Sequence, residues 1–223
     1  MENLPIYVSV LFSAITLLTL LILNRAVGKQ VLFLPLALTW LVIQAFLSYS
    51  GFYLVTETIP PRFLLLIGPP LLLILYLFIS RKGKMLLDTI DPETLTYLHC
   101  VRIPVEITLW LLFSYKFVPQ LMTFEGRNFD ILSGITAPLI AYFGYRQTKL
   151  NKKILLVWNF ICLGLLINIV INAVLSVPFP FQQFAFDQPN TGVLYFPFTW
   201  LPCFIVPAVL FSHLVCIRKL LGA

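Results

Sequence analysis

The chain has 223 residues, of which 60% are hydrophobic and only 11% are charged. This composition excludes an ordinary soluble domain and is typical of an integral membrane protein. The net charge of +6 is carried by short segments between apolar runs, which argues against a nucleic-acid-binding surface and indicates contact with anionic membrane lipids.

The fold prediction follows from seven apolar runs. They cover about residues 5–24, 31–54, 63–80, 96–117, 131–146, 154–176 and 193–216. Most of them are long enough to supply the roughly 20 helical residues that cross a bilayer core, and the links between them are too short for a soluble module. We therefore predict one all-α domain over residues 1–223, an integral membrane bundle of seven transmembrane helices.

Basic residues alternate between the two sides of this predicted bundle. If the links after the first, third and fifth runs and the C-terminus are cytoplasmic, only Arg62, Lys116 and Arg127 of the 15 cations lie on the other side. The positive-inside rule then predicts an extracytoplasmic N-terminus and a cytoplasmic C-terminus in the cell's inner membrane. Most acidic residues fall on the outer side, namely Glu2, Glu57, Glu125, Asp130 and Asp187.

The first run is predicted to remain in the protein, since basic residues follow it and no small-residue cleavage site is present. The start of the fourth helix is predicted from Asp91-Pro92-Glu93, in which an N-cap acid precedes a proline suited to the first helical position. Pro104 then falls inside this helix and predicts a kink.

Glu106 is the strongest candidate for a functional residue. An ionisable side chain inside a membrane span normally faces the bundle interior and has a partner. His99, Arg102 and Glu106 share one helical face, so an intrahelical pair between Arg102 and Glu106 is the simpler alternative.

Amides on two other helices are expected to face the same interior. Asn168 and Asn172 are four residues apart on the sixth helix, and Gln44 lies near the middle of the second. Hydrogen bonding between helices is the ordinary use of such amides. If these faces meet Glu106, however, they form a polar pocket that runs from mid-membrane to the outer surface.

Two outer links add further candidate ligand-binding residues. Between the fourth and fifth helices, Glu125, Arg127 and Asp130 are predicted near the outer mouth. Arg127 could present its guanidinium to an anionic ligand group in a vestibule that Glu57, Glu125 and Asp187 also shape. A capped turn with a local ion pair is the alternative. The link 177–192, which contains Gln183 and Asp187 among four phenylalanines, is predicted either to lie at the headgroup level or to cover the pocket.

The histidines and cysteines give a weak metal signal. His99 adjoins Cys100, and His213 precedes Cys216 by three residues, but there is no CxxC or HExxH motif. We expect no bound metal, no other cofactor and no disulfide framework.

These observations predict a multipass protein that binds a small amphipathic or lipid-like molecule in a pocket open to the extracytoplasmic side, and that could transport it. Membrane lipids are the expected surroundings. One alternative is an intramembrane enzyme that uses Glu106 or Asp187 as an acid or base. Another is a structural or assembly subunit with a membrane-protein partner.

Overall fold

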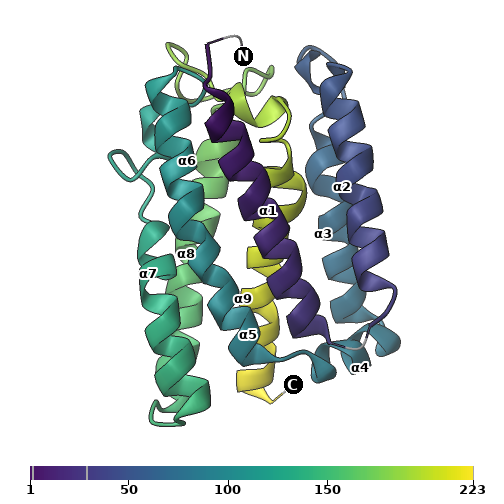
Figure 1. Ribbon diagram of the computed structural model, residues 1–223, viewed down its shortest axis with the longest axis vertical. Helices are drawn as coiled ribbons and strands as arrows, with labels where there is room; N and C mark the ends of the chain where they lie inside the picture. Colours follow the sequence, from purple (N-terminus) through teal and green to yellow (C-terminus); the bar gives the residue numbers. More distant parts are fainter. Residues whose placement is uncertain (2, 29, 223) are drawn as a thin grey trace.

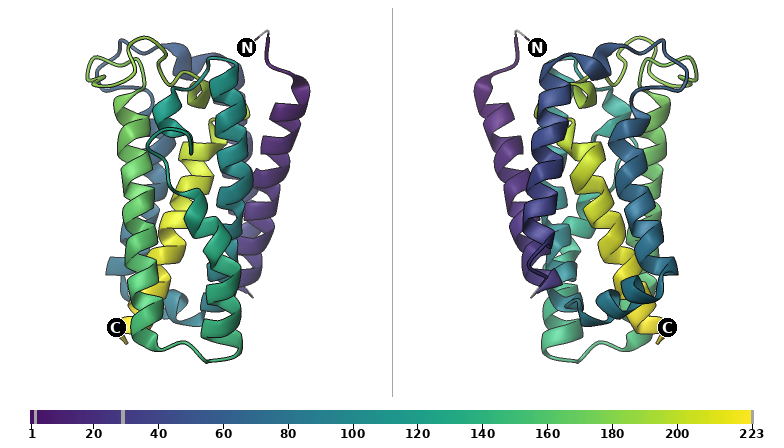
Figure 2. Two further views of the ribbon diagram at one scale, coloured as in Figure 1. Left: turned by 90° about the vertical axis from the view of Figure 1, so that its left-hand side faces the viewer. Right: turned by 90° about the vertical axis from the view of Figure 1, so that its right-hand side faces the viewer.

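The computed structural model describes residues 1, 3–28 and 30–222, and this part of the chain contains helices and links but no β-strand. Glu2, which the charge pattern assigns to the outer side, lies outside the described residues. The helices run side by side along the long axis of the molecule, and the two termini lie at opposite ends (Figure 1; Figure 2).

The helices correspond to the predicted apolar runs, with shifted bounds. A 3₁₀ turn (His99–Val101) joins α5 to α6, while π-helical segments extend the end of α7 (Ala141–Arg146) and precede α9 (Leu201–Ile205). The α-helices are α1 (Ile6–Val27), α2 (Phe33–Tyr49), α3 (Leu64–Ile79), α4 (Arg81–Thr89), α5 (Pro92–Leu98), α6 (Arg102–Ser114), α7 (Ile131–Ile140), α8 (Lys152–Leu175) and α9 (Val206–Leu221).

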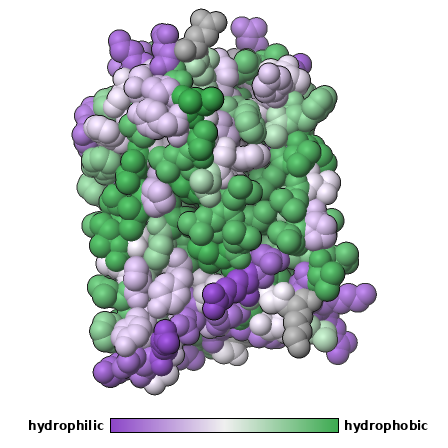
Figure 3. Space-filling view, viewed as in Figure 1, coloured by the Kyte–Doolittle hydropathy of each residue, from purple (hydrophilic) through white to green (hydrophobic). Residues whose placement is uncertain are grey.

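Four of the described helical segments are long and apolar enough to cross a membrane: Ile6–Val27, Pro92–Ser114, Lys152–Leu175 and Leu201–Leu221. A fifth is added if the bent pair α3 and α4 is counted as one span. The predicted all-α class is therefore confirmed, and the several apolar helices fit a membrane protein. On the face shown in Figure 3, apolar residues cover much of the middle, with polar residues towards both ends.

The fourth helix begins where the sequence predicts. Asp91 accepts hydrogen bonds from the backbone N–H groups of Glu93 (3.3 Å) and Thr94 (3.0 Å), and Pro92 is the first residue of α5. This is the N-cap arrangement that satisfies donors left free at a helix start. The last predicted run begins later than expected, because residues 193–200 form a short 3₁₀ turn and an irregular link before the helix starts at Leu201.

A sharp bend separates α3 from α4. The two helices meet at 92°, so α4 lies across the end of the bundle near the C-terminus (Figure 1). Gly83 permits the bend, because a Cβ atom there would lie 2.3 Å from the Leu77 carbonyl oxygen. Leu87 and Ile90 of this short segment are buried, whereas Lys84 is exposed, so it is an amphipathic element at the rim of the bundle.

Two tryptophans link α2 to the last helical segment. Trp40 Nε1 donates to the Cys203 carbonyl (3.0 Å), and Trp200 Nε1 donates to the Leu41 carbonyl (3.0 Å). Pro207 has no N–H to offer the Cys203 carbonyl four residues before it, so Trp40 supplies a donor there.

Candidate functional site

The link between α6 and α7 builds the centre of the site. It leaves the N-terminal end of the bundle and descends, so that α7 begins about half-way along the molecule (Figure 2). Gly126 allows this path, since a Cβ atom there would lie 2.2 Å from the Gln120 carbonyl oxygen. The descent brings Asn128 and Asp130, both buried, to the level of α6. Irregular backbone at this depth requires internal partners, and Asn128 provides them by donating to the Met122 carbonyl (3.0 Å) and accepting from the Asp130 N–H (3.0 Å).

Arg102 and Asp130 form a buried ion pair at this level. Arg102 Nε donates to Asp130 Oδ2 at 2.6 Å, and a second guanidinium nitrogen pairs with Oδ1. The guanidinium also contacts the Cys162 carbonyl (3.2 Å). Two expectations are therefore corrected. Asp130 does not lie at the outer mouth, and the partner of Arg102 is Asp130 instead of Glu106 on its own helix.

His213 extends this ion pair into a chain of hydrogen bonds. Arg102 donates to His213 Nε2 (3.0 Å), because a guanidinium has no acceptor. His213 Nδ1–H is then free to donate to Asn159 Oδ1 (3.0 Å), and Asn159 Nδ2 donates to the Leu155 carbonyl (2.9 Å). His213 is thus a neutral imidazole whose two ring nitrogens are both satisfied.

His99 stacks on His213 but takes no part in this chain. The two rings are 3.9 Å apart between centroids, and Trp158 meets His99 edge-on at 5.5 Å. Both ring nitrogens of His99 are buried and have no hydrogen-bond partner in the part of the chain that the structure describes.

The rings of His99 and His213 are in contact, as a shared metal site would require. Cys216 Sγ, however, contacts the Pro92 carbonyl oxygen (3.8 Å). Among the described residues, no group of three or more His, Cys, Asp and Glu side chains is placed to hold a metal ion.

Glu106 lies one turn from Arg102 on α6 and is 2% exposed. Asn128 Nδ2 donates to its Oε1 at 2.5 Å, while Oε2 has no hydrogen-bond partner among the described residues. A buried carboxyl oxygen without a hydrogen-bond partner is costly, so this atom can accept an additional hydrogen bond.

Glu106 borders a cavity of about 60 Å³ between α6, α8 and the last helical segment. This volume can hold a few water molecules or a small polar group. The positive charge of Arg102 is already matched by Asp130, so the free oxygen of Glu106 can accept from a hydrogen-bond donor. The remaining wall is almost wholly apolar and consists of Val105, Leu109, Met122, Leu166, Ile169, Val170, Ala173, Leu201, Ile205, Val206 and Val209.

The structure brings together only three of the predicted ligand-binding residues at this cavity: Arg102, Glu106 and Asp130. Gln44 lies elsewhere and accepts from the Tyr53 hydroxyl. Asn168 Nδ2 donates to the Arg127 carbonyl (2.9 Å), and Asn172 Nδ2 donates to the Asn168 carbonyl (2.9 Å). These three amides therefore make hydrogen bonds within the protein, which is the structural alternative given in the sequence analysis.

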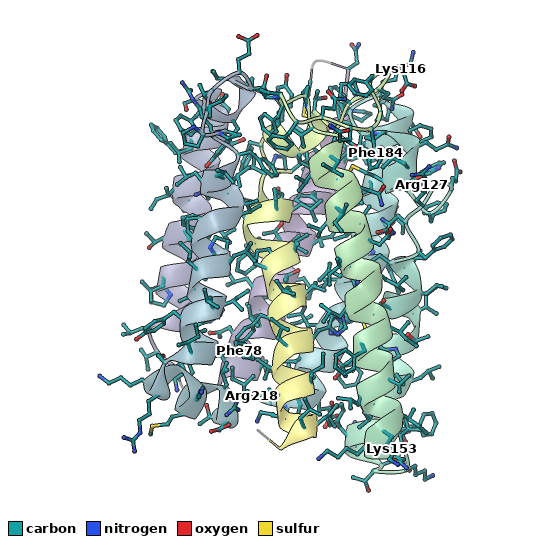
Figure 4. All side chains as sticks on the ribbon, turned by 180° about the vertical axis from the view of Figure 1, so that it is seen from behind. Phe78, Lys116, Arg127, Lys153, Phe184 and Arg218 are labelled. Atoms are coloured by element: carbon teal, nitrogen blue, oxygen red, sulfur yellow. The ribbon has the colours of Figure 1, made fainter. Side chains whose placement is uncertain are left out.

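The remaining predicted residues lie in the links that the charge pattern assigns to the outer side, and they do not line the cavity. Glu125 accepts from Trp110 Nε1 (2.9 Å), and Arg127 lies 5.9 Å from the ring centre of Phe184 (Figure 4). The side chains of Glu57, Gln183 and Asp187 are exposed.

The Phe-rich link 177–192 closes the end of the bundle beside the cavity. Asn190 Nδ2 donates to the carbonyl of Ala173 (3.1 Å), a cavity residue, and Gln188 Nε2 donates to the Val118 carbonyl (2.6 Å). Phe179 is buried against Phe63, with ring centres 5.6 Å apart, whereas Phe186 is 71% exposed. Part of the link therefore packs on helix ends and part points outward, and none of its residues lines the Glu106 cavity.

Sequence reasoning missed the importance of Asn128 and Asn159. Asn159 lies on the face of α8 opposite Asn168, so helical spacing separates it from the predicted pocket. Its signal was its polarity in the middle of an apolar span. Asn128 offered no comparable signal, because a polar residue in a link is usually exposed.

Comparison with curated proteins and with solved structures found no match to this chain. A comparison with protein families found one whose model matches residues 59–221. This range contains all of Arg102, Glu106, Asn128, Asp130, Asn159 and His213. The chain belongs to the family described as "Domain of unknown function (DUF8737)".

Proposed function

We propose that this protein crosses the inner membrane seven times and binds a small amphipathic molecule whose polar group reaches Glu106. The observation that carries the proposal is the buried Oε2 of Glu106, which has no hydrogen-bond partner among the residues that the structure describes. Glu106 borders a cavity whose wall is apolar apart from this residue and the Arg102–Asp130 pair. A few convergent polar groups in a mostly apolar cavity are typical of small-molecule sites.

The chemistry of the cavity defines the class of ligand. Glu106 accepts hydrogen bonds, and the adjacent Arg102 is engaged by Asp130. The preferred polar group is therefore a donor such as a hydroxyl or an ammonium group. An apolar body would lie against Leu166, Ile169 and their neighbours and extend beyond the small enclosed volume.

The position of the cavity favours entry from the extracytoplasmic side. Its wall includes Ala173, near the end of α8, and Leu201, at the start of the last helical segment. Both positions lie towards the end of the bundle that holds the N-terminus, which the positive-inside rule assigns to the outer side.

Seven crossings require that the shorter segments also span. α2 has 17 residues, while α7 and its π-helical extension have 10 and 6. The descending link before α7 supports this interpretation, because it covers the remaining depth with backbone that is bonded within the bundle.

The proposal is tested by purifying the protein in mild detergent, applying native mass spectrometry, and then identifying bound molecules by organic extraction. We expect one retained small molecule with a hydrogen-bond donor and an apolar body. Val170→Trp, which fills the cavity, should abolish retention. Ile161→Trp on the exposed face of the same helix should retain the molecule. Equal retention by both variants would contradict the proposal.

A further inference from the structure

A second and larger cavity lies on the other side of α9. It has a volume of about 440 Å³, within the range of about 300–1,000 Å³ found for ligand sites. Phe204, Pro207, Ala208 and Phe211 face it from the last helical segment. Ile205, Val206 and Val209 of that segment face the Glu106 cavity instead, so the two cavities are separated by one helix.

The walls of this cavity suit a hydrocarbon chain. They come from α1, α2, α3, α4 and the last helical segment, and nearly all of their side chains are apolar. Trp40 lines the cavity, but its indole N–H donates to the Cys203 carbonyl. Neither of these two polar groups therefore needs a partner inside the cavity.

The cavity is continuous with the apolar exterior of the bundle. Leu36 of α2 and Leu73 of α3 both line it and are 66% and 58% exposed. In a bilayer these exposed surfaces contact lipid tails, so a chain can enter sideways without crossing a polar region.

A polar residue and a helix with several basic residues contribute to the wall of this cavity. Gln30, in the link between α1 and α2, lines it and is exposed. Leu86 of α4 and Ile90, the residue after this helix, also line it, and α4 exposes Arg81, Lys82 and Lys84. The amphipathic helix thus contributes an apolar side chain to the cavity wall and carries three exposed cations within five residues of it.

We infer that this cavity holds an acyl chain of an anionic glycerophospholipid, with the phosphate headgroup held by the basic residues of α4. The apolar volume accommodates the chain, the exposed leucines admit it from the bilayer, and the cations select a negative headgroup. This inference requires only that the chain lies in a membrane, so it stands independently of the Glu106 site.

The test uses the full-length protein in vesicles that contain phosphatidylcholine or phosphatidylglycerol with a photoactivatable group on the acyl chain. Crosslinked peptides are then mapped by mass spectrometry. We expect phosphatidylglycerol to label residues of the cavity wall, such as those around Pro70 and Phe211, in preference to phosphatidylcholine.

Two pairs of variants separate the chain-binding and headgroup-binding parts. Ala37→Phe, which fills the cavity, should abolish labelling of the wall by either lipid, whereas Ala14→Phe on the exposed face of α1 should not. Changing Arg81, Lys82 and Lys84 together to Gln should reduce the preference for phosphatidylglycerol by at least about tenfold, because each cation near a membrane surface contributes a factor of roughly five.

The matched control changes Lys149, Lys152 and Lys153 to Gln. These cations lie in or beside the link between α7 and α8, and Lys153 is on the opposite side of the bundle from Phe78 of α3 (Figure 4). The control should keep the lipid preference of the unmodified protein. An equal loss in both triple variants, or wall labelling that Ala37→Phe leaves unchanged, would overturn the inference. Loss of Glu106-dependent binding would leave these results unaffected.

Discussion

Arg102 and Asp130 are separated by 28 positions in the sequence, yet they form an ion pair whose residues are only 2% and 6% exposed. Asp130 reaches this depth because the link before α7 descends into the bundle. The pair is further held by contacts of Arg102 with His213 and the Cys162 carbonyl. It therefore fixes α6, α7, α8 and α9 relative to one another around the Glu106 cavity.

Removing one member of this pair should destabilise the protein strongly. Arg102→Met or Asp130→Leu leaves an unpaired charge in the interior and should lower the free energy of unfolding by about 3–5 kcal/mol. The double variant should recover most of this loss, because neither charge then remains. Unfolding in mixed micelles, followed by circular dichroism, measures the three variants. A double variant whose loss equals the sum of the two single losses would show that the pair is not coupled.

The sequence predicts local features of this fold better than the contacts between its elements. The cap at Asp91 and the apolar runs depend on nearby residues, and the structure agrees with both. The charge pattern placed Arg102 and Asp130 on opposite sides of the membrane, because run boundaries do not indicate that a link enters the bundle. The isolation of Glu106 in an apolar span did single out a residue that borders the central cavity, but its partner Asn128 depends on that same descent.

The two stacked histidines should respond differently to the same substitution. His213→Phe removes hydrogen bonds to Arg102 and Asn159 and should destabilise the protein by about 1.5–3 kcal/mol. His99→Phe keeps an aromatic ring against His213 and removes two buried nitrogens that have no hydrogen-bond partner within residues 1, 3–28 and 30–222. It should therefore be neutral or stabilising. Thermal unfolding of both variants under one detergent condition gives the comparison, and a larger loss for His99→Phe would contradict this interpretation.

The contact between α2 and the last helical segment should depend on Trp40. Trp40→Phe leaves the Cys203 carbonyl without this donor and should reduce the free energy of unfolding by about 1 kcal/mol. Trp110→Phe is the control, because its hydrogen bond to Glu125 is exposed and should contribute less. Both variants are compared by denaturant titration. Equal losses would show that the Trp40 bond has no special structural role.

The orientation in the membrane is tested with single cysteines at exposed positions near opposite ends of the bundle. Asp187→Cys should react with a membrane-impermeant maleimide in intact spheroplasts, whereas Lys153→Cys should react only after permeabilisation. Both positions are exposed in the structure. The unmodified protein is the control, because Cys162, Cys203 and Cys216 are buried and Cys100 is half-buried. Labelling in the reverse order would invert the proposed topology.

The most direct test of the central claim is a binding titration of the extracted molecule against Glu106→Gln. This change keeps the size of the side chain but replaces the Oε2 acceptor with an amide NH2 group, which cannot accept from the proposed donor. Glu125→Gln is the matched control, because it removes an exposed charge away from the cavity. We predict that Glu106→Gln remains folded and binds at least about tenfold more weakly, while Glu125→Gln binds like the unmodified protein. Unchanged affinity in folded Glu106→Gln would contradict the proposed site.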